Sequence, residues 1–237
     1  MNEARIYHQP GVLRVFQTKE ETRAFYNRIA RIYDILAEHS EAPARKAGLK
    51  VLNVQPGQKI LEIGFGTGHS LVELAKSVGP EGKVYGIDLS EKMLEISEKR
   101  ARRQKLEDRM ELLCGDAVHL PYESEFLDGI FMSFTLELFD TPDIIVVLSE
   151  CKRVLKPGGR IVIVGMSRVR PRGFIMKTFE WIHKHFPNYL DCRPILVQQA
   201  LEDSGFKICD REIKKVWINV EVICGSKVTD EIDTTDG

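Results

Sequence analysis

The chain has 237 residues, 43% of them apolar and 29% charged, a composition that supplies a globular core and excludes fibrous and disordered classes. Lysine and arginine total 34 and aspartate and glutamate 35, so the formal net charge of −1 offers no basic field for sequence-independent nucleic-acid binding. The apolar runs fall well short of the roughly 18 residues of a spanning helix, and the N-terminus lacks a secretory pattern. We therefore expect a cytoplasmic protein without a transmembrane segment.

The N-terminal part reads as an arm followed by helices. Residues 1–17 show no sustained periodicity, which predicts a flexible arm. Thr18, with glutamate three positions later, is a candidate capping box, and apolar residues at spacings of three and four over 25–36 predict an amphipathic helix. A second helical stretch is expected over about 43–52, so that residues 18–55 form a helical cap.

From residue 56 onward, strand and helix patterns alternate, which predicts one domain over 56–227 with a doubly wound, mostly parallel α/β sheet. The seven expected strands cover 59–64, 83–88, 110–115, 126–134, 159–165, 206–213 and 216–225, and the expected helices cover 69–78, 90–105, 142–155 and 194–204. Only Lys214 and Lys215 separate the last two strands, so they can form a hairpin but no crossover, and an antiparallel strand is expected to end the sheet.

Two further segments stand apart from this alternation. Residues 168–194 combine arginines with an amphipathic aromatic run, which predicts an inserted lid that covers an apolar acceptor, lies on a lipid surface or packs on the domain. The acidic tail 228–237 is expected to be disordered. The cysteines lack metal-site or redox spacing, so we expect buried, reduced thiols and no metal site; they are Cys114, Cys151, Cys192, Cys209 and Cys224.

The strongest functional signal is a glycine-rich loop after the first strand, with Gly64, Gly66 and Gly68 in the run LEIGFGTG. Three glycines in five residues allow a sharp turn and close approach of a ligand. The dinucleotide fingerprint requires a further glycine where this chain has His69. Glu62 places a carboxylate beside the loop, which disfavours a pyrophosphate and attracts an ammonium group.

Two aspartates follow at the ends of the next strands. Asp88 lies 20 residues after the last loop glycine, where a carboxylate can accept hydrogen bonds from a ribose diol; the alternative is a helix N-cap, which Ser90 would serve equally. Asp116, after the third strand, can accept a hydrogen bond from an adenine amine or can simply be a turn aspartate.

The ordered set LEIGFGTG, GID, GDA, FLDGIFMSF and RVLKPGGRIVIV resembles the class I S-adenosylmethionine-dependent methyltransferases, over about residues 59–164. The run RVLKPGGRIVIVGMS together with Tyr33-Asp34 is similar to the UbiE/COQ5 group. The resemblance implies a Rossmann-like fold and S-adenosylmethionine as cofactor. It also implies which residues bind that cofactor: Glu62, Gly64, Gly66, Thr67, Gly68, Asp88, Leu89, Asp116, Ala117 and Ser133.

The chain differs from that group at three places. Gly165 stands where the group has glutamate, Glu137 stands where it has arginine, and Leu36-Ala37 replace methionine and asparagine. The acceptor therefore stays open at this point, between a quinone-like ring and an amine such as a phospholipid headgroup. Two functions outside this class also remain, a dinucleotide-dependent oxidoreductase and a non-catalytic S-adenosylmethionine-binding protein.

Methyl transfer needs alignment and, for some acceptors, removal of a proton, but no dedicated nucleophile. The candidate catalytic residues are Tyr33 in the N-terminal helix and Glu137 after the fourth strand, with His119 as a weaker third. Tyr33 has core packing as its alternative, and Glu137 has the role of a helix-start carboxylate. The expected partner is a small or lipid-like methyl acceptor, with peripheral membrane contact and a homodimer as further possibilities.

Overall fold

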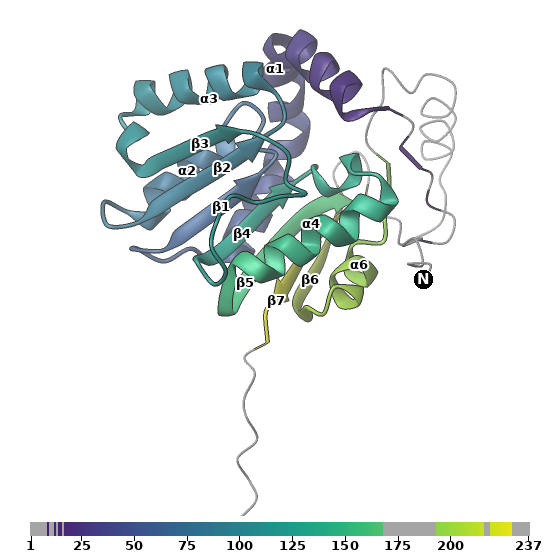
Figure 1. Ribbon diagram of the computed structural model, residues 1–237. Helices are drawn as coiled ribbons and strands as arrows, with labels where there is room; N and C mark the ends of the chain where they lie inside the picture. Colours follow the sequence, from purple (N-terminus) through teal and green to yellow (C-terminus); the bar gives the residue numbers. More distant parts are fainter. Residues whose placement is uncertain are drawn as a thin grey trace, which may run out of the picture.

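The computed structural model describes residues 9, 12, 14, 15, 17–167, 193–215 and 219–228, the side chains of residues 31–40 and 215 excepted. Seven strands form one sheet in the order β3-β2-β1-β4-β5-β7-β6, with helices on both faces (Figure 1). All pairs from β3 to β5 are parallel, whereas β7 pairs antiparallel with both β5 and β6. The predicted doubly wound sheet with a C-terminal antiparallel strand is confirmed.

The elements follow the expected order closely. The helices are α1 (Lys19–Leu52), α2 (His69–Val78), α3 (Glu91–Gln104), α4 (Thr141–Val154) and α6 (Val197–Asp203), with short 3-10 turns η1 (Glu107–Arg109) and η2 (Leu136–Leu138). The strands are β1 (Lys59–Ile63), β2 (Lys83–Asp88), β3 (Met110–Cys114), β4 (Leu127–Ser133), β5 (Leu155–Met166), β6 (Lys207–Lys215) and β7 (Asn219–Ser226).

The hydrophobic core is divided by the sheet into two clusters. Residues of α1, α2 and α3 pack on one face, and residues of α4 and α6 pack on the other. The central strands β1 and β4 are buried on both sides because helices cover both faces, which explains their nearly continuous apolar sequences. This packing holds the carboxyl ends of β1, β2 and β4 in fixed positions at one edge of the sheet.

Helix α1 is one continuous element of 34 residues, not the two helices that we expected. Its N-terminus has the predicted capping box, in which Thr18 Oγ1 accepts from the Glu21 N–H and Glu21 accepts from the Thr18 N–H. Pro43 lies inside the helix, where it removes one backbone hydrogen bond. The helix continues through it because α1 packs against β4, β5 and β7.

The C-terminal hairpin differs from the expectation in its turn. Lys214 pairs with Val220 and Lys215 with Asn219, so both lysines belong to β6 and do not form the connection between the strands. In this hairpin Cys209 and Cys224 are joined as a disulfide, and the expectation of unpaired thiols is wrong for this pair. The two residues are 15 apart in sequence, so only the register of the hairpin brings their Cα atoms to 5.5 Å.

Cys114 and Cys151 are free thiols; Cys151 is buried, as expected, and Cys114 is exposed. Cys192 lies outside the described residues.

The described residues of the N-terminal arm contact the domain, and the flexibility of the arm stays a prediction. Gln9 is buried and exchanges hydrogen bonds with the backbone of Leu196, and Val12 belongs to the core cluster under α4. Arg14 and the Val15 N–H both bind the carboxylate of Asp140. These partners are distant in sequence, so local periodicity could not predict the contacts.

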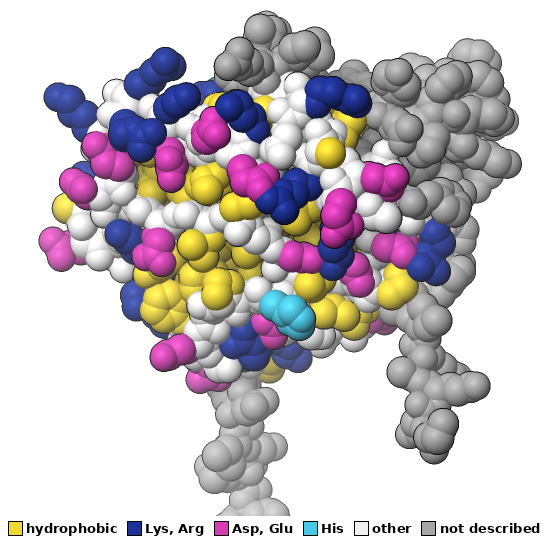
Figure 2. Space-filling view, turned by 45° about the horizontal axis from the view of Figure 1, so that its top comes forward, with side chains coloured by type: hydrophobic (Ala, Val, Ile, Leu, Met, Phe, Trp, Pro, Cys, Tyr) yellow, Lys and Arg dark blue, Asp and Glu magenta, His cyan; other side chains and the backbone are white. Residues whose placement is uncertain are grey.

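Two predicted segments, the lid up to residue 192 and the tail from residue 229, lie outside the described residues. Among the described helices, none is long and apolar enough to cross a membrane. Acidic and basic side chains are interspersed over the face shown in Figure 2, in keeping with the near-zero net charge.

Candidate functional site

Two cavities lie at the carboxyl ends of the central strands, and Gly64 lines both of them. This is the topological switch point between β1 and β4, where open α/β sheets bind ligands. The larger cavity has about 730 Å³ of empty space and is bordered by the ends of β1, β2 and β3, the start of α1 and the loop before α4. The smaller has about 420 Å³ and is bordered by the glycine loop, Ser133 and α1.

The glycine loop shapes the wall between the cavities. Gly64, Gly66 and Gly68 all have positive φ, at 69°, 52° and 81°. A Cβ on Gly64 would lie 2.3 Å from Thr135, because the loop packs directly against the segment after β4. A Cβ on Gly66 would meet no atom within 4 Å, so this part of the loop faces open space in which a ligand fits.

Asp88 lines the larger cavity together with Leu89. Its Oδ2 accepts from the Gly66 N–H at 2.9 Å and its Oδ1 from the Ser90 N–H at 2.9 Å. Ser90, and not Asp88, caps α3 by accepting from the Met93 N–H. Burial raises the pKa of Asp88 to about 6, although both hydrogen bonds oppose the shift. The carboxylate is thus fixed in orientation, with lone pairs left for a ligand.

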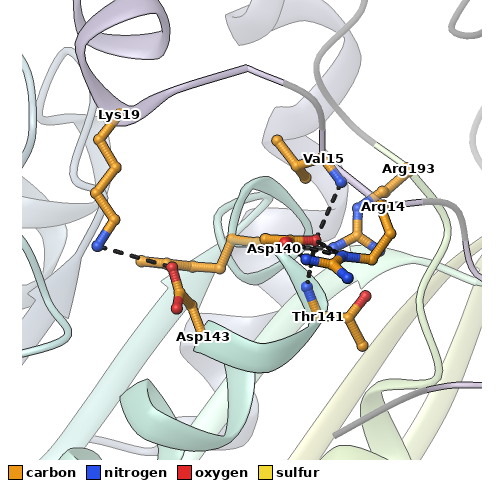
Figure 3. A network of polar contacts seen from close by, with 8 residues as sticks. Arg14, Val15, Lys19, Asp140, Thr141, Asp143 and Arg193 are labelled. Atoms are coloured by element: carbon orange, nitrogen blue, oxygen red, sulfur yellow. Dashed lines mark hydrogen bonds and ion pairs between the residues drawn. The ribbon is translucent and has the colours of Figure 1, made fainter. Parts of the chain in front are cut away.

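Asp116 and Ala117 line the same cavity on the β3 side. Asp116 Oδ1 accepts from the Val118 N–H, as a turn aspartate does, while Oδ2 lies 2.6 Å from Lys19 Nζ. Lys19 also approaches Asp143 at 3.7 Å (Figure 3). The first residue of α1 therefore spans the cavity between a β3 loop and α4.

Glu62 lines the smaller cavity with Thr67 and Ser133. Its side chain is buried, and Oε2 has no hydrogen-bond partner among the described residues. Burial raises the pKa of Glu62 to about 8, against the opposing effects of a Ser70 hydrogen bond and the charge of Arg45. A cationic group in this cavity would supply the partner that Oε2 lacks.

The candidate catalytic residues are placed differently. Glu137, in η2, is fully buried and lines neither cavity, although its neighbours Thr135 and Leu138 line the larger one. Its Oε1 accepts from the Met166 N–H at 3.3 Å. The side chain of Tyr33 lies outside the described residues, and His119 lines neither cavity.

Sequence reasoning missed the residues that close the larger cavity on its N-terminal side. Val15, Gln17, Lys19, Thr22 and Tyr26 line this side. Arg14 holds this segment in place through its guanidinium (Figure 3). Arg14 Nε donates to Asp140 Oδ2 at 2.9 Å, and Arg14 Nη2 donates to the same oxygen at 2.5 Å. Asp140 is also the N-cap of α4 and accepts from the Thr141 N–H.

In the smaller cavity the missed residues are Glu41 and Arg45 of α1. Their spacing of four placed them on one helix face, but nothing in the sequence indicated that this face turns toward the glycine loop. The continuous α1 brings them there.

A model of the ubiE/COQ5 methyltransferase family matches residues 15–191. The chain belongs to this family. The methyltransferase is 36% identical to a demethylmenaquinone methyltransferase of Lactobacillus johnsonii over 176 residues, 72% of this chain and 70% of the relative. It is also 36% identical to one from Staphylococcus aureus over 154 residues, 63% of this chain and 62% of that protein.

Solved structures agree with this assignment. An S-adenosylmethionine-dependent methyltransferase from Aquifex aeolicus is similar with a TM-score of 0.64 and 25% identity, covering 86% of this chain and 98% of that one. An S-adenosylmethionine-dependent methyltransferase from Methanosarcina mazei has a TM-score of 0.64 and 22% identity. The match covers 77% of this chain and 98% of that protein, and it shows that the two share a fold.

The cofactor of this methyltransferase is S-adenosylmethionine, and the residues present fit it. The cofactor carries an ammonium group, a ribose diol and an adenine, and it has no phosphate. The unsatisfied Glu62 Oε2 and the oriented Asp88 match the ammonium and the ribose diol in chemistry, and the open face of Gly66 leaves room for a ligand beside the loop. The contacts of individual residues with the cofactor stay predictions.

Proposed function

We propose that this methyltransferase transfers a methyl group to a ring carbon of a reduced, quinone-like acceptor. The observation that carries the proposal is the similarity to proteins named demethylmenaquinone methyltransferase, at 36% identity over most of the chain. The relatives offer no support for the oxidoreductase alternative.

In this proposal each cavity holds one half of the cofactor. The larger cavity takes the adenosine, with the ribose on Asp88 and the adenine between Leu89 and Ala117. The smaller cavity takes the amino-acid part, with its ammonium on Glu62. Gly64 lines both cavities, so the sulfonium that joins the two halves would lie near Gly64 and Thr135.

When bound, S-adenosylmethionine supplies an electrophilic methyl group on a positively charged sulfur. The residues of the chain then hold the donor in line with the acceptor carbon and exclude water, which accounts for a large share of the rate enhancement in such reactions. Thr135 supports this alignment, because its Oγ1 lies 3.3 and 3.0 Å from the carbonyl oxygens of Gly64 and Ser133, which share its one hydroxyl proton. The loop and the end of β4 are thus held as one unit.

The test is incubation of the purified protein with methyl-labelled S-adenosylmethionine and a short-chain demethylmenaquinol. Mass spectrometry would locate the label. We expect label on a ring carbon with the reduced acceptor and none with the oxidised one, which is a poor carbon nucleophile. Label in phosphatidylethanolamine vesicles instead would move the acceptor to the amine class, and no transfer to either would favour a non-catalytic cofactor-binding protein.

The cytoplasmic location, the homodimer and membrane contact by residues 168–194 stay predictions. Sedimentation of the purified protein with and without anionic vesicles would test the last two together.

A further inference from the structure

A lysine and two aspartates meet at one wall of the larger cavity. Lys19 Nζ lies 2.6 Å from Asp116 Oδ2 and 3.7 Å from Asp143 Oδ2. All three residues line the cavity, and their side chains are 47%, 28% and 36% exposed. Ion pairs this exposed add little to the stability of a fold. Their polar atoms are accessible to a ligand in the cavity.

The position of Lys19 is set by the helix that carries it. Lys19 is the first residue of α1, directly after the Thr18 capping box. Two turns further along α1, Asn27 Oδ1 accepts a hydrogen bond from the Ser90 hydroxyl at 2.6 Å. The start of the helix is thus attached to the segment that follows Asp88. The backbone, and not only a long side chain, holds the ammonium of Lys19 at the cavity.

Lys19 and Asp116 present a hydrogen-bond donor and an acceptor next to each other. Burial lowers the pKa of Lys19, but the hydrogen bonds and charges of Asp116 and Asp143 outweigh this effect, and the pKa is raised above its ordinary value. The side chain is therefore a charged ammonium with three N–H donors and no acceptor. One N–H for each carboxylate leaves a third for a ligand.

The edge of an adenine has the complementary pattern, an amine donor beside a ring-nitrogen acceptor. The side-chain amides of asparagine and glutamine, which also combine a donor and an acceptor, bind adenine through two such hydrogen bonds. A carboxylate ligand would be repelled by Asp116 and Asp143, and an ammonium ligand would be repelled by Lys19. A neutral base edge avoids both repulsions.

The order of the strands brings this pair to the adenine end of the cofactor. β1, which precedes the glycine loop, pairs with β2, and β2 pairs with β3. Neighbouring strands are about 4.8 Å apart, so Gly64, Asp88 and Asp116 follow one another along the edge of the sheet. The amino-acid part, the ribose and the adenine have the same order in the cofactor. With the ribose on Asp88, the adenine lies toward Asp116 and Lys19.

We propose that Lys19 donates a hydrogen bond to the ring nitrogen beside the adenine amine, N1 or N7, while Asp116 accepts from the amine. This inference rests on the place that the proposed function gives to the cofactor. The positive charge of Lys19 strengthens the hydrogen bond. Asp143 positions the ammonium from the α4 side. Lys19 is then a binding residue that makes the larger cavity specific for adenine.

The test compares S-adenosylhomocysteine by calorimetry with its 1-deaza and 7-deaza analogues, in which a carbon replaces one ring nitrogen. Lys19→Met removes the ammonium. Lys76→Met is the matched control, because Lys76 forms an exposed ion pair with Glu73 on α2 and lines neither cavity. We expect one analogue to bind the wild type and Lys76→Met at least about tenfold more weakly than S-adenosylhomocysteine. In Lys19→Met the same analogue should bind within about twofold of S-adenosylhomocysteine.

Three results would overturn the proposal. If the wild type binds both analogues as tightly as S-adenosylhomocysteine, no donor contacts either nitrogen, a result that stands even where Lys19→Met does not fold. If the loss for an analogue is the same in the wild type and in Lys19→Met, the nitrogen is bound by another group. If the wild type does not bind S-adenosylhomocysteine, the proposal fails together with the cofactor site.

Turnover separates this proposal from the proposed function. If the wild type fails to methylate the quinol but loses affinity for one analogue in a Lys19-dependent way, the acceptor assignment fails and the adenine contact stands. If the wild type methylates the quinol and shows no Lys19-dependent loss, the proposed function stands and the role of Lys19 is wrong.

Discussion

The two sides of the cofactor site are built in different ways. The sheet side consists of a contiguous glycine loop and aspartates at the ends of neighbouring parallel strands, all fixed by the central sheet. The helical side is assembled from the arm, the start of α1 and the turn after β4, which are far apart in sequence. The sheet side is therefore fixed by local sequence, whereas the helical side depends on long-range contacts.

The largest effect is expected from a substitution in the glycine loop of the sheet side. Gly66→Val places a side chain in the open space of the loop, so we expect loss of detectable cofactor binding by calorimetry. Gly57→Val is the matched control, because Gly57 also has positive φ and an open Cβ position but lies outside both cavities. Both variants should lose about 1–2 kcal/mol of stability from the left-handed backbone. Retained binding in Gly66→Val would show that the loop does not touch the cofactor.

A smaller effect is expected at the ribose position. Asp88→Ala should weaken S-adenosylmethionine binding by about 1.5–3 kcal/mol, the value of charge-assisted hydrogen bonds. Asp128→Ala removes a carboxylate of similar structural importance, which binds the Lys59 N–H and Lys156 away from the cavities, and should leave affinity unchanged. Equal affinities for S-adenosylmethionine in the two folded variants would show that Asp88 does not contact the cofactor.

The pH dependence of binding sharpens the assignment of Glu62. In the free protein its pKa is about 8, so the carboxyl is mostly protonated below that pH. A bound ammonium favours the ionised form, so binding releases a proton and affinity should fall by up to about tenfold per pH unit from pH 8 to pH 6. Calorimetric titrations in two buffers of different ionisation enthalpy would give the number of protons released on binding.

Glu62→Gln provides the control for this prediction. Affinity should be lower at pH 8 and nearly independent of pH, while the free protein gains stability at that pH because the buried charge is gone. A wild-type affinity that is flat over this range would contradict the placement of the ammonium at Glu62.

The smallest expected effect lies in the arm. Arg14 is half exposed, so Arg14→Gln should weaken cofactor binding only about two- to fivefold, by loosening the wall that Val15 and Gln17 contribute. The effect should shrink at high salt because the ion pair is screened. Arg102→Gln removes an exposed i,i+4 pair on α3 and serves as the control. Equal affinities in the two variants would show that the arm does not support the cavity.

Much of the fold could be predicted from local patterns. The helix over 69–78 and the strand over 83–88 have the predicted bounds, because apolar periodicity and flanking glycines act within a few residues. The single helix α1 could not be predicted, since Pro43 signals a break and only packing on the sheet overrides it. The pairing of Cys209 with Cys224 depends on hairpin register and is invisible in their spacing.

The site, like the fold, combines residues that local sequence predicts with residues that only long-range contacts place. Gly64, Gly66, Asp88 and Asp116 line the cavities, because strand ends in a parallel sheet converge on one edge, whereas Gly68 lines neither cavity. Their contacts with the cofactor stay predictions. Lys19 and Arg45 were missed, because each reaches the site through contacts made across the sequence. Glu137 was a candidate catalytic residue because it is a carboxylate in an apolar stretch, but its side chain is fully buried and lines neither cavity.

We propose that one cofactor bridges the two cavities at Gly64. A crystal structure with S-adenosylhomocysteine would test this arrangement. We expect the ribose hydroxyls on Asp88 in the larger cavity and the ammonium within hydrogen-bond distance of Glu62 in the smaller one. A ligand confined to one cavity, or with its amino-acid part among Lys19, Asp116 and Asp143, would contradict it.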